Sequence, residues 1–276
     1  MLLASSQVNY TKPFLKWPGG KRWLTRRIVG LLDGCRFQRY FEPFLGGGAL
    51  FFALQPPNAV LSDINADLIN TYTQVKYRPL KVIASLKKLR VKEATYKKVR
   101  IYNPETKLER AVRLLYLNRT GFGGMYRLNQ NGDFNVPFGG GERTPTTLWQ
   151  DHLLTSASRS LRHTELVCSD FEDQLTEANT GDLVYCDPTY TVTHDNNGFV
   201  RYNERNFSWA DQIRLAVACR SAARRGATVL VSNAAHDKVL ELYRSCEVHE
   251  FDRMSVLCPN SEKRRPTKEL LVVIRP

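Results

Sequence analysis

The sequence has no closely spaced pair of cysteines and no long apolar run. Its six cysteines, at positions 35, 168, 186, 219, 246 and 258, include no C-x-x-C pair, so neither a zinc site nor a disulfide framework is indicated. The first seven residues lack the basic start of a signal peptide. No apolar run approaches the roughly 18 residues that a membrane span needs. We therefore expect reduced thiols, a cytoplasmic location, no metal ion and no membrane partner.

Acidic residues are scarce relative to basic ones. The 276 residues include 40 Lys and Arg against 27 Asp and Glu, which gives a formal charge of +13. Such a balance is expected of a protein that binds a polyanion, although many basic proteins bind none. The length suits one large domain or a domain with an insertion, and no internal repeat or low-complexity tract is visible. Motifs must therefore decide the function.

The stretch that organises the chain is residues 183–190, L-V-Y-C-D-P-T-Y. Its first four residues predict a buried central strand, which ends at Asp187 and Pro188. Open α/β sheets bind ligands at the carboxyl ends of their strands, and the proline fixes the backbone there. A carboxylate followed by the ring of Tyr190 suits a flat heterocycle with an exocyclic amino group, as in the reading of flipped-out bases. The structural alternative is an Asp-Pro turn that only ends a strand.

A strand, a glycine turn and a helix follow one another in residues 40–54. The strand is predicted at 40–45, the turn at 46–48 and the helix from Ala49. The next strand, 59–62, ends at Asp63, about 20 residues further on, where an acid takes the ribose hydroxyls of a bound nucleotide. This spacing favours a cofactor that contains adenosine. A dinucleotide is disfavoured, because the loop is not G-x-G-x-x-G, and a glycine turn kept for helix packing is the alternative.

Two glycine-rich segments present aromatic and basic side chains. In residues 14–21, F-L-K-W-P-G-G-K, Trp17 offers a stacking face and two lysines bring charge, unless the segment is a plain surface turn. Residues 120–141 are dense in glycine, asparagine and aromatics, with a hairpin turn at Asn131-Gly132. There Met125 can wedge between bases and Arg127 can reach a guanine or a phosphate. A loop packed by its own aromatics is as compatible with this composition.

The rest of the chain alternates between helices and strands. Residues 68–113 are helical and basic, and a solvated helix face explains most of their charge. Strands are predicted at 165–168, 228–232 and 269–274, the last closing the sheet, and a helix at 209–225 that Gly226 ends. Between the last strands, the basic turn 263–268 adds Arg264 and Arg265 as candidate phosphate contacts. The prediction is one open α/β sheet interrupted by an inserted domain.

Taken together, these stretches resemble the Dam family (D12 class) of DNA adenine-N6 methyltransferases. The matching blocks are F-L-K-W-P-G-G-K at 14–21, E-P-F-L-G-G-G-A-L-F-F at 42–52, S-D-I-N at 62–65, L-Y-L-N-R-T-G-F-G-G-M-Y-R and F-N-V-P-F-G within 115–139, V-Y-C-D-P-T-Y at 184–190 and S-N at 232–233. The resemblance implies a Rossmann-like, S-adenosylmethionine-dependent methyltransferase sheet with an inserted helical target-recognition domain. The expected catalytic domain is 8–72 and 158–276, and the expected recognition domain is 73–157.

The resemblance also assigns roles to residues. It implies that S-adenosyl-L-methionine is the cofactor, that double-stranded DNA is the partner, and that the enzyme is a site-specific adenine methyltransferase, with a monomer assumed. The expected catalytic residues are Asp187, Pro188 and Tyr190. The expected cofactor contacts are Trp17, Lys21, Phe44, Gly46, Asp63, Phe171 and Asp187. The expected DNA contacts are Lys16, Phe122, Met125 and Arg127, with Arg264 and Arg265 added from the basic turn.

Four positions depart from the family pattern. The family motif is usually D-P-P-Y, and Thr189 is expected to loosen that turn and lower activity. Gly123 replaces an asparagine, and Gly140-Gly141 replaces an Arg-Tyr pair, so GATC is only a candidate target sequence. The alternatives are a DNA-binding pseudoenzyme of the same fold and a methyltransferase that acts on RNA or on a protein amide. Cytosine-C5 chemistry is excluded, since Cys186 faces away from Asp187 along the strand.

Overall fold

The computed structural model describes residues 11–129, 131–140, 149–191, 207–254 and 266–276. Its residues group into two compact units. Unit 1 comprises residues 1–35, 45–59 and 63–168, and unit 2 comprises residues 36–44, 60–62 and 169–276. The inserted domain predicted at residues 73–157 lies wholly within unit 1, which extends beyond it at both ends. The limits of that domain stay a prediction.

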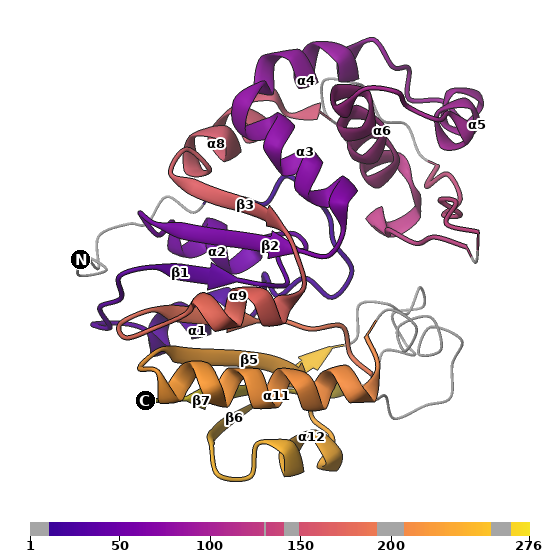
Figure 1. Cartoon of the computed structure of the whole chain (residues 1–276). Coiled ribbons are helices and arrows are strands. Elements are labelled where there is room, and N and C mark those ends of the chain that lie inside the picture. The colour runs from indigo at the N-terminus through magenta and orange to yellow at the C-terminus, as the bar shows by residue number, and fades with distance from the viewer. Residues whose placement is uncertain (1–10, 130, 141–148, 192–206, 255–265) are drawn as a thin grey trace. The chain divides into compact units, whose positions relative to one another are not determined.

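A seven-stranded mixed sheet has the order β3-β2-β1-β4-β5-β7-β6 (Figure 1). β1, β4 and β5 run parallel, and β7 is antiparallel to both β5 and β6. The strand order reverses between β1 and β4, which is where ligands bind in open sheets of this kind. The strands are β1 (Tyr40–Glu42), β2 (Ala59–Asp63), β3 (Thr164–Cys168), β4 (Leu183–Cys186), β5 (Thr228–Ala234), β6 (Glu247–Met254) and β7 (Pro266–Ile274).

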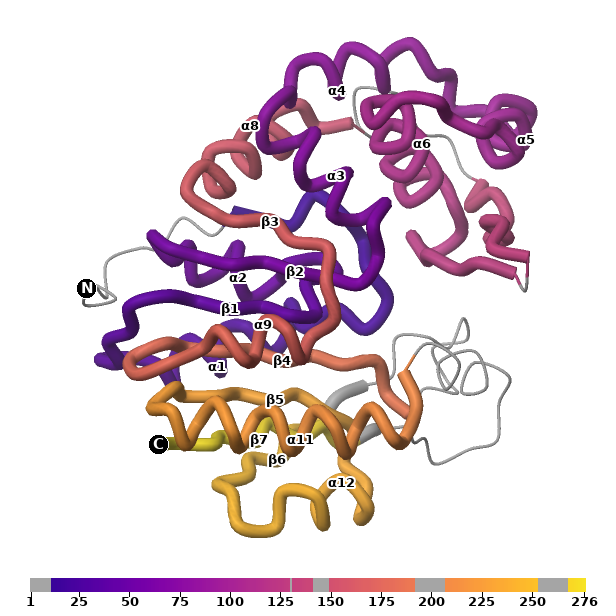
Figure 2. Tube along the Cα trace, viewed as in Figure 1, coloured from indigo at the N-terminus to yellow at the C-terminus, as the bar shows by residue number. Residues whose placement is uncertain are grey.

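The predicted α/β fold class is confirmed, with one correction at the edge of the sheet. The strand predicted at residues 269–274 does not close the sheet, because β7 lies between β5 and β6 (Figure 2). β6 forms the edge and had no prediction. Its sequence, EVHEFDRM, offers no apolar run, since an edge strand is partly solvated and needs none.

Helices α9 (Phe171–Glu177), α11 (Trp209–Arg224) and α12 (Asp237–Leu242) belong to unit 2. α11 buries one face against β5 and α9. It starts with a capping box, in which Ser208 and Asp211 bond to each other's backbone N–H groups. It ends before Gly226, whose φ of +99° is a conformation that favours glycine. The helix predicted from residue 209 and ended by Gly226 is thus confirmed.

Unit 1 contains a cluster of helices around α6. A core of aromatic rings forms where Phe14 meets Tyr72 and Phe52, at ring-centroid distances of 4.9 and 6.1 Å. Thr106 and Glu109 form a capping box at the start of α6. In the described residues of this unit the helices are α1 (Thr25–Leu31), α2 (Ala49–Leu54), α3 (Ala66–Tyr77), α4 (Pro79–Lys87), α5 (Glu93–Ile101), α6 (Lys107–Thr120), the 3-10 turn η1 (Phe122–Gly124) and α8 (Asp151–Ser160).

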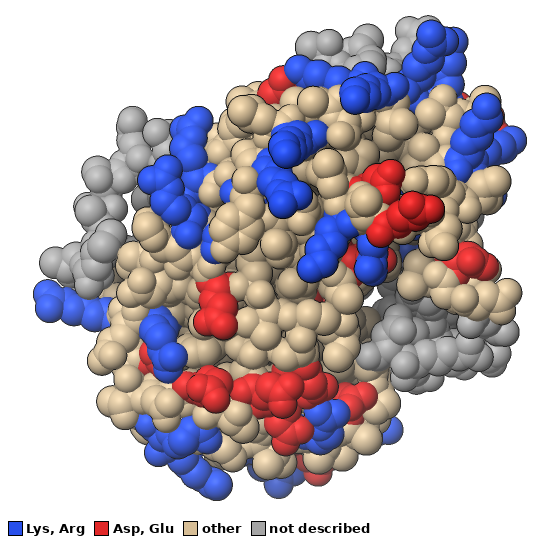
Figure 3. Space-filling view, turned by 45° about the horizontal axis from the view of Figure 1, so that its top comes forward, with Lys and Arg blue, Asp and Glu red and all other residues tan. Residues whose placement is uncertain are grey.

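Basic side chains are concentrated on helices α3 to α5 and their connections. Figure 3 shows Lys and Arg side chains spread over one face of the molecule, with a group of Asp and Glu side chains in its lower part. Two of these lysines form ion pairs, Lys87 with Asp151 and Lys97 with Glu93. The exposed basic residues of this region are Arg78, Lys81, Lys87, Lys88, Arg90, Lys92, Lys97 and Lys98. Among the described residues, no helix is both long and apolar enough to cross a membrane.

Candidate functional site

Asp187 lies at the carboxyl end of β4, as predicted. All four residues of β4 are buried, and β1 and β5 flank the strand in parallel. Asp187 itself is half-buried and Pro188 is buried. Thr189, which departs from the family motif, is exposed, and the ring of Tyr190 is half-buried. The threonine therefore does not belong to the buried frame of the motif.

Buried tyrosines support the strand on which Asp187 is placed. The Tyr185 hydroxyl lies 2.9 Å from the Ser232 hydroxyl of β5, and the Tyr40 hydroxyl donates to Glu42 Oε2 at 2.7 Å. Burial, and then the charge of Asp187, raise the pKa of Tyr185 well above its usual value. Burial and Glu42 do the same to the pKa of Tyr40. Both phenols therefore stay neutral, and they act as structural hydrogen-bonding groups rather than as bases.

Cys186 precedes Asp187 but cannot serve as a nucleophile. Its side chain is completely buried in the apolar core of unit 2. Burial, followed by a hydrogen bond with Cys219, raises the pKa of the Cys186 thiol well above its usual value. A protonated and inaccessible thiol lacks the reactivity that cytosine-C5 chemistry needs, which agrees with the exclusion made from the sequence.

A buried polar network holds the backbone directly after the D-P-T-Y motif. Asn233, at the end of β5, donates from Nδ2 to Gln212 Oε1 at 3.0 Å, and Gln212 Nε2 donates to Thr191 Oγ1 at 3.0 Å. Thr191 Oγ1 in turn donates to the Phe207 carbonyl at 3.3 Å. The sequence analysis missed Thr191 and Gln212. The available signal was a glutamine on the otherwise apolar face of α11.

Three phenylalanines of unit 2 form an aromatic cluster after β1. Phe44 stacks on Phe171 with centroids 5.3 Å apart, and Phe207 approaches both rings. The guanidinium of Arg214 lies 4.7 Å from the centroid of the Phe171 ring. It also pairs with Asp170, at 2.6 Å, and with two further carboxylates. The structure thus brings together Phe44 and Phe171, two of the predicted cofactor contacts.

Asp63, at the end of β2, belongs to unit 1 and is tied to the glycine turn. Its Oδ2 accepts from the backbone N–H of Gly46 at 3.1 Å, and its Oδ1 accepts from that of Asn65 at 2.9 Å. Burial raises the pKa of Asp63, while these two hydrogen bonds oppose the shift. The Tyr72 hydroxyl donates to the Gly46 carbonyl at 3.1 Å. Backbone N–H groups on either side of the carboxylate, one of them from the turn that precedes α2, therefore orient it.

The segment that contains Trp17 and Lys21 packs on the same turn. A Cβ atom on Gly46 would lie 2.8 Å from Trp17 Cδ1, so only glycine allows this approach. Gly46 also has a φ of +44°. Lys21 is only 3% exposed, and its ammonium group donates to the Gly19 carbonyl at 3.1 Å. Four predicted cofactor residues, Trp17, Lys21, Gly46 and Asp63, thus lie in unit 1.

The predicted base-reading loop is attached to the segment that contains Lys16. Asn118, which is completely buried, accepts from the Lys16 backbone N–H at 3.0 Å and donates to the Lys16 and Gly124 carbonyls at 2.6 and 3.0 Å. The Tyr126 ring stacks on Trp17 at 5.2 Å. Asn118 lies in one of the sequence blocks that match the family, but the sequence analysis assigned it no role. Its burial is decided by tertiary packing.

Arg127 belongs to a hairpin that the sequence predicted. Residues Leu128 and Phe134 form an antiparallel bridge around Gly132, which has a φ of +83°. The Arg127 guanidinium donates from Nε to Asn135 Oδ1 at 2.7 Å. Of the other predicted DNA contacts, Phe122 is 49% exposed and Met125 is half-buried. Arg264 and Arg265 lie outside the described residues, as does Gly141.

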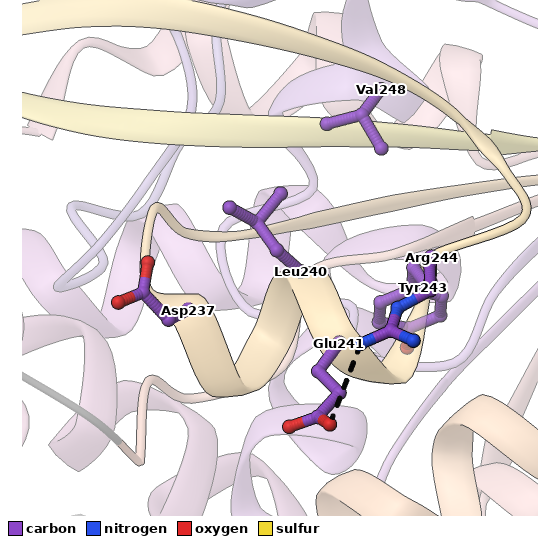
Figure 4. A pocket seen from close by; sticks show the side chains of 6 residues that line it. All are labelled: Asp237, Leu240, Glu241, Tyr243, Arg244 and Val248. Atoms are coloured by element: carbon purple, nitrogen blue, oxygen red, sulfur yellow. Dashed lines mark ion pairs between the residues drawn. The ribbon is translucent and has the colours of Figure 1, made fainter.

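Two surface hollows lie in unit 2, away from the predicted site residues. One, of about 480 Å³, lies between α12 and β6 and is lined by side chains such as Leu240, Tyr243 and Val248 (Figure 4). Another, of about 410 Å³, is lined by Arg220, Arg224 and neighbouring residues. In the described parts of the chain, no group of three or more His, Cys, Asp or Glu side chains could hold a metal ion.

The sheet and the motifs at its strand ends define a Rossmann-like methyltransferase, and comparison with known proteins gives the family. The model of the D12 class N6 adenine-specific DNA methyltransferases matches residues 17–257. The chain is 34% identical to a type II methyltransferase of Lactococcus lactis subsp. cremoris, over 98% of each protein. It is 31% identical to a DNA adenine methylase of Escherichia coli strain K12, over 96% of each. The chain therefore belongs to the D12 class of N6 adenine-specific DNA methyltransferases.

A further relative is a longer protein, and the similarity covers only part of it. The chain is 34% identical to a DNA N-6-adenine-methyltransferase of an Escherichia phage. That match covers 91% of this chain but 34% of the phage protein. The chain is thus similar both to a type II methyltransferase of a bacterium and to a methyltransferase of a phage.

Proposed function

We propose that the protein transfers a methyl group from S-adenosyl-L-methionine to the N6 amino group of an adenine that is flipped out of duplex DNA at a specific site. The observation that carries the proposal is Asp187, half-buried at the carboxyl end of β4 and followed by buried Pro188. Membership in an adenine-specific family supplies the substrate class. The cytoplasm remains the expected location.

Several of the predicted contact residues have the chemistry that parts of the proposed cofactor require. Asp63, whose two oxygens are oriented by backbone N–H groups, suits the ribose hydroxyl pair. The stacked rings of Phe44 and Phe171 offer an apolar surface to an adenine ring. The buried ammonium group of Lys21 suits a carboxylate of the cofactor. When bound, this cofactor supplies an electrophilic methyl group on a sulfonium centre.

Asp187 and the Pro188 carbonyl are proposed to activate the adenine amino group. The lone pair of this nitrogen is delocalised into the ring, which makes it a poor nucleophile. Two acceptors hold its two protons, draw the nitrogen toward tetrahedral geometry and direct its lone pair at the methyl carbon. With the cofactor bound, the nitrogen would take the methyl group as the bond from that methyl to sulfur breaks, and Asp187 or water would take the surplus proton. Orientation and fixed negative charge lower the barrier as positive charge develops on nitrogen.

Tyr190 and the loop of unit 1 are proposed to handle the flipped base and its neighbours. The ring of Tyr190 follows the acceptors by two residues and would stack on the adenine. Arg127 is proposed to read a guanine, since its guanidinium is oriented by Asn135. GATC remains the candidate target. The missing Arg-Tyr pair at Gly140-Gly141 removes two side chains that could read or hold it.

The test is transfer of labelled methyl from S-adenosylmethionine to duplex DNA with and without GATC, followed by sequencing that detects N6-methyladenine. We expect methylation confined to one short motif. Asp187→Ala should abolish transfer and leave duplex affinity largely intact, while Glu241→Ala, an exposed charge loss in unit 2, should change neither. Turnover retained by Asp187→Ala would overturn the assignment of this residue. Binding of DNA and cofactor without turnover in the wild type would indicate a pseudoenzyme.

A further inference from the structure

Trp17 contacts both the glycine turn of the predicted cofactor site and the predicted base-reading loop. On the side of the turn, the indole approaches Gly46 so closely that a Cβ atom there would lie 2.8 Å from Cδ1 and 3.2 Å from Nε1. Gly46 in turn donates its backbone N–H to Asp63. The indole therefore packs directly against the turn that orients the proposed ribose-binding carboxylate.

On the side of the loop, the indole meets Tyr126. The two rings are stacked, with centroids 5.2 Å apart and an interplanar angle of 21°. Tyr126 also contacts Phe134 edge to face, at a centroid distance of 5.8 Å, which fixes its ring on the hairpin. Arg127, the proposed guanine reader, is the next residue in the chain. Trp17 thus contacts the residue that directly precedes Arg127 in the chain.

A second connection runs through the backbone of the same segment. The Asn118 side chain bonds to both the N–H and the carbonyl of Lys16, and its amide also holds the Gly124 carbonyl. A Cβ atom on Gly124 would lie 2.6 Å from Lys16 Cβ, so loop and segment are in close contact there. Residues 16–17 and 124–126 are therefore fixed to each other at two points, one polar and one aromatic.

We propose that Tyr126 is a positioning residue that couples occupancy of the cofactor site to base recognition by Arg127, through its stack on Trp17. The inference rests on the proposed function, because it requires that Trp17 contacts the cofactor and that Arg127 contacts the target. By linkage, a cofactor that fixes Trp17 tightens binding of the target duplex, and the target duplex tightens binding of the cofactor by the same factor. Couplings of this kind are typically about 5- to 150-fold.

The experiment measures this coupling factor directly. Duplex affinity is determined by fluorescence anisotropy with and without S-adenosylhomocysteine. One duplex carries the unmethylated target motif found in the transfer assay, and the other lacks that motif. Cofactor affinity is measured by calorimetry with and without the same duplexes. The variants are Tyr126→Phe, which keeps the ring, and Tyr126→Ala and Tyr126→Leu, which remove the stack with and without loss of apolar volume. Tyr77→Ala, at a 68% exposed tyrosine of unit 1, is the matched control.

We expect a coupling factor above about 5 for the target duplex in the wild type, Tyr126→Phe and Tyr77→Ala. In Tyr126→Leu and Tyr126→Ala it should fall to within about 2-fold of unity, while binding of the unrelated duplex changes little. Tyr126→Leu decides the matter if Tyr126→Ala does not fold. An unchanged factor in the folded variants that lack the ring would overturn the inference and leave the proposed function standing. So would a wild type that methylates DNA without coupling. A wild-type protein that binds neither the cofactor nor the duplex would overturn both the inference and the proposed function.

Discussion

At the scale of single residues, Asp63 shows how burial and hydrogen bonding oppose each other in a carboxyl group that is proposed to bind the cofactor. Burial raises the pKa of this carboxyl above the ordinary value of 3.8, and the backbone N–H groups of Asn65 and Gly46 limit the shift. The folded state therefore holds the proton more tightly than the unfolded chain does. The contribution of Asp63 to stability is present below pH 3.8 and is lost as the pH rises through the raised pKa.

This titration should affect cofactor binding with the opposite sign. We expect the affinity for S-adenosylhomocysteine to fall as the pH drops through the raised pKa of Asp63, because only the ionised carboxylate accepts both ribose hydroxyls. Asp63→Asn should bind about 10- to 100-fold more weakly near neutral pH, as expected for lost bonds to a charged acceptor. Its affinity should vary less with pH, whereas Asp67→Asn should resemble the wild type. Calorimetry over a pH series checks this, and a wild-type pH profile retained by Asp63→Asn would contradict it.

Arg127 is the residue at which recognition of a base can be separated from attraction to phosphate. If the guanidinium reads a guanine, Arg127→Ala should lose about 1–3 kcal/mol of discrimination at one position of the target and retain affinity for unrelated duplexes. Competition binding against duplexes substituted at each position of the motif measures the loss. Arg110→Ala, which removes an arginine paired with Asp67, serves as the control. An equal loss on every duplex would identify a phosphate contact instead.

At the scale of elements, α11 joins Thr191, which directly follows the D-P-T-Y motif, to β5. Gln212 is completely buried, and its amide accepts from Asn233 and donates to Thr191. Thr191 also bonds to the carbonyl of Phe207. Such a network is stabilising only when each member is satisfied, because a buried polar group without a partner keeps the full cost of its desolvation.

Gln212→Leu should therefore destabilise the protein, although leucine and glutamine side chains have similar volumes. We expect a loss of about 1–3 kcal/mol in the free energy of unfolding for each polar group that remains buried without its partner. Ile213→Ala, at the exposed neighbouring position, should stay within about 0.5 kcal/mol of the wild type. Urea denaturation measures both variants. Equal stability of Gln212→Leu and the wild type would show that the network contributes little.

The elements differ in how well they could be predicted from their sequences. β4 was predicted with its observed limits, because a strand buried on both faces reads as a continuous apolar run that a proline ends. The helix at 209–225 and its glycine stop followed from helical periodicity and a residue that tolerates positive φ. β6 escaped prediction, since an edge strand carries polar side chains on its solvated face. The backbone hydrogen bonds that define it come from β7, far along the chain.

At the scale of the whole molecule, the formal charge of +13 concerns the binding of duplex DNA more than the fold. We expect the logarithm of the binding constant to fall linearly with the logarithm of salt concentration, with a slope of about −0.9 per neutralised phosphate. Lys→Gln changes in α4 and α5 and at the residues that cap them should reduce this slope. The test set is Lys81, Lys88, Lys92 and Lys98, and the comparison pair is Lys87 and Lys97, which already pair with carboxylates. A slope that both sets leave unchanged would place the DNA elsewhere.

The sequence by itself determined the fold class, the family and most of the residues proposed to act. These depend on local patterns: an apolar run before Asp187, a glycine turn before a helix, an acid about 20 residues further on, and blocks of residues in a fixed order. Only the tertiary structure decided which side chains hold those residues in place. Asn118, Gln212 and Thr191 are ordinary polar residues in sequence, and their partners lie 102, 21 and 16 positions away. Their role arises when folding buries them, because a buried polar group must find a partner that the local sequence does not name.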